Sequence, residues 1–156
     1  MTRELLESLE ARGLTIGFAE SLTGGALAYA WIKHRGASRV VRGALVAYDS
    51  ELKISLLGVP EALIERDSPV SEAVARAMAH GCRDVCQTDL AVSTTGNAGP
   101  SLQDRTDRRV AWIAVSDREK TITRMLSFQK ETRTEAIELT VEKAIDTVGL
   151  LLKNDG

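Results

Sequence analysis

The sequence predicts a single three-layer α/β/α domain over residues 1–156, with a mixed sheet and one antiparallel edge. Strand-like and helix-like segments alternate through the first half of the chain, which is typical of parallel strands joined by helices. Three strand-like segments then follow one another before a last long helix, which favours an antiparallel edge. The length suits one domain, and 44% hydrophobic with 27% charged residues is an ordinary globular composition.

The first half of the chain predicts two buried strands and five helices. Gly13 and Gly58 stand where helices would end. Asp49 or Ser50, and later Ser71, stand where helices would begin. The expected elements are a helix at 2–12, a strand at 14–18, a helix at 26–33, a strand at 40–48, and helices at 51–57, 61–66 and 72–87.

The second half predicts three strands and one long helix. Short apolar runs favour strands at 90–94, 110–115 and 121–128, with a hairpin turn between the last two. A polar loop at 101–109 follows the first of them. The segment 133–152 has apolar residues at helical spacing, which predicts a helix packed on the sheet.

Charge and hydropathy exclude several classes of function. A formal net charge of -2 gives no basic field that would recruit nucleic acid. The chain has no run near the ~18 apolar residues of a membrane span, so we expect no membrane partner. The N-terminal segment at 1–7 is amphipathic and acidic, unlike a signal peptide, and we therefore expect a cytoplasmic protein.

The cysteines and histidines do not predict a metal site. Cys82 and Cys86 lie four residues apart in a helical pattern, so we expect reduced thiols that are buried as small hydrophobic groups. A metal would need further ligands, and neither His34 nor His80 belongs to a cluster of metal-ligand type. We expect neither a metal nor a cofactor.

A turn between the first strand and the second helix is the first candidate site. Ser21, Thr23, Gly24 and Gly25 fall there. The first amides of a helix have no intrahelical partner, and glycine permits a close approach to the backbone, so an anion can bind at such a turn. The alternative is that Thr23 merely caps the helix and the glycines merely permit the turn.

Two further polar segments follow strands and would meet this turn at the ends of the sheet strands. They carry Tyr48, Asp49, Ser50 and Lys53, and Thr94, Thr95, Gly96, Asn97 and Gly99. A serine needs a base before it can act as a nucleophile. Because neither histidine follows a strand, Lys53 is the better candidate, and burial beside a helix N-terminus would lower its pKa. The alternatives are a solvated surface lysine, and a tyrosine that only borders the core.

The three segments together resemble the CinA C-terminal domain family of competence/damage-inducible proteins. Ala19-Glu20-Ser21-Leu22-Thr23-Gly24-Gly25 is similar to the family's A-E-S-C-T-G-G, with leucine in place of cysteine. Residues 42–53 are similar to R-G-x-V-x-Y-S-N-x-x-K, and 96–100 to G-I-A-G-P. The match extends over about 130 residues in one register. Active members hydrolyse nicotinamide mononucleotide to nicotinate mononucleotide and ammonia.

The resemblance implies roles for residues at matching positions. Ser21 would be the nucleophile, Lys53 the general base, and Tyr48 its assistant. Thr23, Gly24 and Gly25 would lie near the nucleotide phosphate or the oxyanion. Thr95, Gly96 and Gly99 would line the facing wall, and Arg133 would hold the phosphate. The expected partner is a small nucleotide in pyridine nucleotide salvage and NAD metabolism, and the family tends to form homo-oligomers.

The segment after Pro100 departs from the family pattern. The family has a glycine-rich loop and then K-P-V-G, whereas residues 101–109 lack those glycines, and Arg109 stands at the last of them. Arg108 or Arg109 would bind phosphate in a new way, or the site would be blocked. Three hypotheses follow: an amidohydrolase with a serine–lysine mechanism, a catalytically impaired nucleotide-binding or regulatory domain, and a hydrolase of another amide or ester.

Overall fold

The fold is a five-stranded mixed sheet in the order β2-β1-β3-β4-β5, in a computed structural model that describes residues 1–100 and 108–154. The strands are β1 (Ile16–Glu20), β2 (Val41–Val46), β3 (Leu90–Gly96), β4 (Val110–Ser116) and β5 (Thr121–Ser127). β1 pairs in parallel with both β2 and β3. β4 and β5 add the antiparallel edge. The predicted mixed sheet with one antiparallel edge is confirmed.

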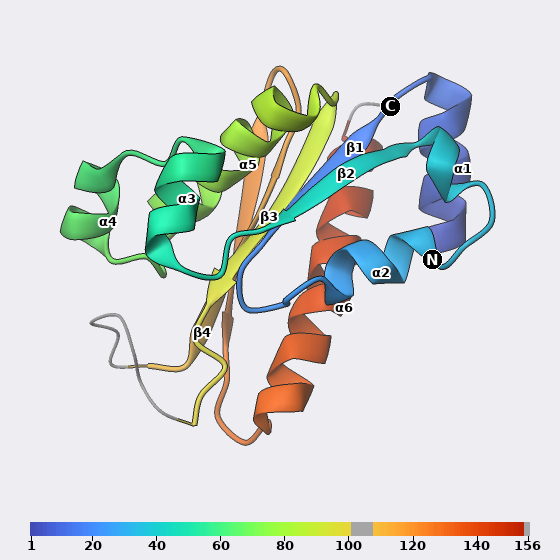
Figure 1. Cartoon of the computed structure of the whole chain (residues 1–156). Coiled ribbons are helices and arrows are strands. Elements are labelled where there is room, and N and C mark those ends of the chain that lie inside the picture. The colour runs from blue at the N-terminus through green and yellow to red at the C-terminus, as the bar shows by residue number, and fades with distance from the viewer. Residues whose placement is uncertain (101–107, 155–156) are drawn as a thin grey trace.

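Helices cover both faces of the sheet (Figure 1). One face carries α1 (Thr2–Arg12), α2 (Ala26–Ile32) and α6 (Arg133–Lys153), whose apolar residues pack with β1, β3 and β4. The other carries α3 (Ser50–Leu57), α4 (Glu61–Asp67) and α5 (Glu72–Cys86). A short 3₁₀ turn, η1 (Ala37–Arg39), which was not predicted, precedes β2. In both helical layers the helices pack through the side on which their apolar residues gather, because these residues recur at helical spacing.

Two of the helices, α3 and α5, begin at the capping residues that the sequence predicts. The Asp49 side chain accepts a hydrogen bond from the Glu51 amide at the start of α3, and Gly58 ends that helix in the left-handed conformation. Ser71 caps α5 through the Val74 amide. These caps set the start of the two helices that flank the site, and the first of them carries Lys53.

The sequence placed the ends of β1 and β3 too early. β1 spans Ile16–Glu20 rather than 14–18, and β3 continues through Gly96 rather than ending at Thr94. Among the added residues, Glu20 in β1 and Thr95 in β3 are polar and buried, and they interrupt the apolar pattern from which a strand is predicted. Thr95 is satisfied because its hydroxyl donates to the Pro69 carbonyl at 2.7 Å. Of the loop predicted at 101–109, residues 101–107 lie outside the described residues.

Candidate functional site

The three predicted loops do meet, because β2, β1 and β3 are parallel neighbours and their carboxyl ends reach one edge of the sheet. Ser21 directly follows β1, and its amide donates to the Thr94 carbonyl in β3 at 3.1 Å. Tyr48 follows β2 by two residues and leads into α3. This edge is where open α/β sheets bind ligands.

Ser21 and Lys53 form a buried pair at this edge. Lys53 Nζ lies 3.0 Å from Ser21 Oγ. It also lies 3.1 Å from both the Ala47 and the Tyr48 carbonyl oxygens. Lys53 is 2% exposed and Ser21 is 5% exposed. The alternative of a solvated surface lysine is therefore wrong.

The contacts of the Lys53 amine fit two protonation forms. An ammonium would donate to the serine oxygen and to both carbonyls, whereas a neutral amine would donate to the carbonyls and accept from the serine hydroxyl. The second arrangement is the one that a general base needs before it removes the serine proton. Whether the amine is charged or neutral, its hydrogen bonds to the two carbonyls hold the Lys53 nitrogen next to Ser21 Oγ.

Tyr48 contacts the pair through its backbone rather than its ring. Its carbonyl oxygen accepts from Lys53, while its side chain is 58% exposed. The phenol oxygen instead accepts a hydrogen bond from Arg133 Nη2 at 3.0 Å, and Arg133 Nη1 donates to the Gly99 carbonyl at 2.7 Å. Arg133 is the first residue of α6. It therefore bridges the loops that follow β2 and β3.

The Ser21 turn is organised by Glu20, a residue that the sequence reasoning did not select. Glu20 is fully buried, and its carboxylate accepts hydrogen bonds from the amides of Gly25, Leu27 and Ala28 at 2.9–3.1 Å. The N-terminus of α2 therefore holds an anion, but this anion is the chain's own carboxylate. A charged residue at the end of an apolar run, before two glycines, was the available signal.

Thr23 does not cap α2. The N-cap position is Gly25, with φ of 101°, and no side chain caps the helix. The Thr23 hydroxyl donates to Glu20 Oε1 at 2.6 Å and lies 2.9 Å from the Thr94 hydroxyl. The simple capping alternative is therefore wrong, and Thr23 belongs to a buried network between β1, α2 and β3.

The segment at the end of β3, residues 96–99, has little room for side chains and is fixed by hydrogen bonds. A Cβ on Gly96 would lie 2.8 Å from the Ala111 Cα, so β4 leaves no room for a side chain there. Gly99 has a φ of 72°, and its amide donates to Asn97 Oδ1 at 2.9 Å. Arg109 Nε and Nη2 both donate to the Ala98 carbonyl, at 3.1 and 2.6 Å. Arg109 thus fastens this turn, while Arg108 is exposed.

No group of three or more potential metal ligands occurs among residues 1–100 and 108–154. Cys82 and Cys86 are free thiols with sulfur atoms 3.9 Å apart, and burial raises the pKa of the Cys82 thiol well above its usual range. His80 lies on α5 beside Thr121, away from the pair. Within the described part of the chain, no helix is both long and apolar enough to cross a membrane.

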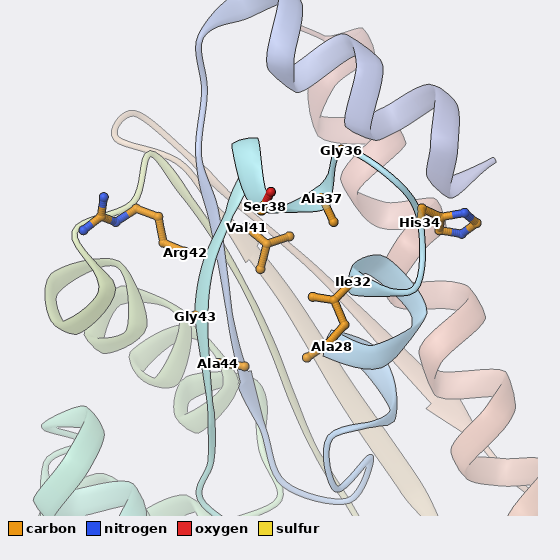
Figure 2. Close-up of a pocket in the computed structure, with 10 residues that line it drawn as sticks. All are labelled: Ala28, Ile32, His34, Gly36, Ala37, Ser38, Val41, Arg42, Gly43 and Ala44. Atoms are coloured by element: carbon orange, nitrogen blue, oxygen red, sulfur yellow. The ribbon is translucent and has the colours of Figure 1, made fainter.

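A separate pocket of about 490 Å³ lies between α2, η1 and β2. Figure 2 shows Ala28, Ile32 and Val41 around it, while the side chains of His34 and Arg42 point away. Arg42 instead donates to the Cys86 carbonyl at 2.9 Å. None of the predicted site residues lines this pocket.

The geometry defines an α/β protein with a buried serine–lysine pair at the carboxyl edge of parallel strands. The family model of the CinA C-terminal domain matches residues 1–152, and the chain belongs to that family. A CinA-like protein of Prochlorococcus marinus is 38% identical over 147 residues, which are 92% of this chain and 34% of that protein. One of Gloeobacter violaceus is 51% identical over 88 residues, 56% of this chain and 21% of that protein.

Solved structures support the same assignment. The competence/damage inducible protein CihA of Agrobacterium tumefaciens has a TM-score of 0.91 at 29% identity, covering 96% of this chain and 92% of that one. A competence or damage-inducible protein of Enterobacter asburiae has a TM-score of 0.91 at 30% identity, covering 96% and 95%. The chain spans about a third or less of the curated relatives it matches.

Proposed function

We propose that the protein hydrolyses the carboxamide of nicotinamide mononucleotide to nicotinate mononucleotide and ammonia, a step of pyridine nucleotide salvage. The observation that carries the proposal is the 3.0 Å contact between Ser21 Oγ and Lys53 Nζ, both buried where three parallel strands end. The substrate itself is taken from the family resemblance. A serine–lysine pair is an established variant of the serine–histidine arrangement.

The reaction divides into two steps. Neutral Lys53 removes the proton from Ser21 as Oγ attacks the carboxamide carbon, and the ammonium that forms then gives this proton to the leaving ammonia. A water molecule next attacks the acyl-serine, with Lys53 again taking the proton. The products are one carboxylic acid and one ammonia for each amide and water consumed.

Backbone amides of the Ser21 turn would stabilise the developing oxyanion by donating hydrogen bonds to it. The Gly24 amide donates to the Ser21 carbonyl, and the Gly25 amide donates to Glu20, so both are engaged within the protein. Within the described residues, the amides of Leu22 and Thr23 have no hydrogen-bond acceptor. These two amides are therefore the candidates for the oxyanion site.

Arg133 is the candidate for holding the substrate phosphate. Its guanidinium is solvent-exposed and donates one hydrogen bond each to Gly99 and Tyr48. A guanidinium carries five N–H donors, so donors remain for phosphate oxygens. Thr95, by contrast, already donates to Pro69, and Gly96 and Gly99 would contribute only backbone to the facing wall.

Ammonia release from nicotinamide mononucleotide tests the proposal. We expect turnover by the wild type and a loss of about 10³-fold or more for Ser21→Ala, because the nucleophile is removed. Ser116→Ala is the matched control, since Ser116 is also a buried serine but lies at the opposite end of the sheet. Absence of ammonia with the wild type, or equal release by Ser21→Ala, contradicts the proposal.

The second candidate function is a catalytically impaired nucleotide-binding or regulatory domain. It is favoured by Arg109, which occupies the position of a family glycine and packs against Gly99. This candidate predicts that nicotinamide mononucleotide raises the melting temperature while no ammonia is released. Efficient turnover excludes it.

A further inference from the structure

A chain of hydrogen bonds connects the backbone of Ser21 to the carboxylate of Glu20. The Ser21 amide hydrogen is shared between the Thr94 carbonyl at 3.1 Å and Thr94 Oγ1 at 3.3 Å. Thr94 Oγ1 lies 2.9 Å from Thr23 Oγ1, which lies 2.6 Å from Glu20 Oε1. Glu20, Ser21, Thr23 and Thr94 are all buried. The chain therefore lies inside the protein, beneath the nucleophile.

The chemistry of the groups gives this chain a single direction. An ionised carboxylate only accepts, so the Thr23 hydroxyl donates its one hydrogen to Glu20. Thr23 then accepts from the Thr94 hydroxyl, and Thr94 in turn accepts from the Ser21 amide. Each hydroxyl is consequently fixed as a donor on one side and an acceptor on the other.

Glu20 itself is held rigidly at the far end of the chain. Three backbone amides at the start of α2 donate to its two carboxylate oxygens. Hydrogen bonds to an ionised group are stronger than those between neutral groups. The carboxylate thereby ties α2 to β1, and the two threonines extend this tie to β3.

We propose that Glu20, Thr23 and Thr94 form a positioning network that orients Ser21 toward Lys53. This inference rests on the proposed role of Ser21 as nucleophile, and the side chains of the three residues act through Ser21 without touching the reacting atoms. The network also engages the amide of Gly25, which leaves the amides of Leu22 and Thr23 for the oxyanion. A misplacement of a reacting group by about 1 Å can cost roughly 10²-fold in rate.

Substitution of Thr23 distinguishes a role in positioning Ser21 from a role in binding the substrate. Thr23→Val keeps the shape of the side chain but breaks the bonds to both Glu20 and Thr94. We expect kcat to fall roughly 10–100-fold while KM changes less than about twofold. Thr23→Ser restores the hydroxyl and is expected to restore most of kcat. A rise in KM at unchanged kcat would overturn the inference and assign Thr23 to substrate binding.

The matched control is Thr140→Val. Thr140 is also a fully buried threonine, but its hydroxyl donates to the Ala136 carbonyl within α6. Thr140→Val therefore removes a buried hydroxyl without touching the network, and we expect its kcat to stay within about twofold of the wild type. An equal loss in Thr140→Val and Thr23→Val would mean that kcat follows general stability, which contradicts the inference.

A second readout does not depend on the substrate. Phenylmethylsulfonyl fluoride sulfonylates an activated serine with loss of fluoride, and intact-protein mass spectrometry follows its rate on Ser21. We expect Thr23→Val to slow this labelling about tenfold, and Thr23→Ser and Thr140→Val to label like the wild type. Slow labelling of Thr23→Val alongside a wild type that releases no ammonia supports the network while rejecting the substrate. Unchanged labelling of Thr23→Val rejects the network even if the wild type releases ammonia.

Discussion

Replacing Glu20 by glutamine is expected to destabilise the fold through the α2 N-terminus. The carboxylate accepts four hydrogen bonds: three at Oε1, from Thr23, Gly25 and Leu27, and one at Oε2, from Ala28. Glutamine can keep its carbonyl oxygen at the first position, but its amide group would then face the Ala28 N–H. Two donors cannot satisfy each other.

The magnitude follows from these contacts. Three charge-assisted bonds become neutral, at about 1 kcal/mol each, and one buried amide loses its acceptor, at about 1–3 kcal/mol. Removing a buried charge offsets part of this loss, because the ionised group must be desolvated on folding. We therefore expect Glu20→Gln to lower the free energy of unfolding by about 2–4 kcal/mol. At about 2–4 °C per kcal/mol for a chain of this size, the melting temperature should fall by roughly 5–15 °C.

Urea-induced unfolding followed by circular dichroism measures this change, with the midpoint and the slope fitted together. Glu142→Gln is the control, because Glu142 is an exposed glutamate on α6, and its effect should stay within about 0.5 kcal/mol. A loss below about 1 kcal/mol in Glu20→Gln would refute the view that the carboxylate organises this turn.

Three further outcomes are expected. Lys53→Met should lower kcat by about 10²–10⁴-fold, measured as ammonia release, because it removes the proposed general base. A thermal shift should show that nucleotide still binds, and turnover within fivefold of the wild type would contradict the proposed role. Arg109→Gly should weaken the turn at Ala98 and raise KM, measured by steady-state kinetics; an unchanged KM would show that this arginine does not shape the site. Gly81→Ala should lower the melting temperature by several degrees, since a Cβ there would overlap the carbonyl of Leu57 in α3; an unchanged melting temperature would mean that α3 and α5 can separate freely.

The sequence by itself determined the architecture because its local signals agreed with one another. Apolar runs, helical spacing and capping residues such as Asp49 and Ser71 predicted every helix of four or more residues in the described chain and all five strands, with ends shifted by a few residues. The same local signals placed Ser21 and Tyr48 after parallel strands. Three-dimensional proximity of the loops then followed from the rule that parallel strands end at one edge.

Only the tertiary structure decided what these side chains do. The family motif indicated Lys53, but the burial of its amine against Ser21 depends on how α3 packs, and the local pattern of a short helix does not show this. The fold likewise decided which anion accepts hydrogen bonds from the amides at the α2 N-terminus. A turn with free amides predicts a bound anion, but local sequence cannot tell a ligand from an internal carboxylate. Glu20 fills that position because β1 ends directly beneath α2, which brings its side chain within hydrogen-bonding reach of the helix amides.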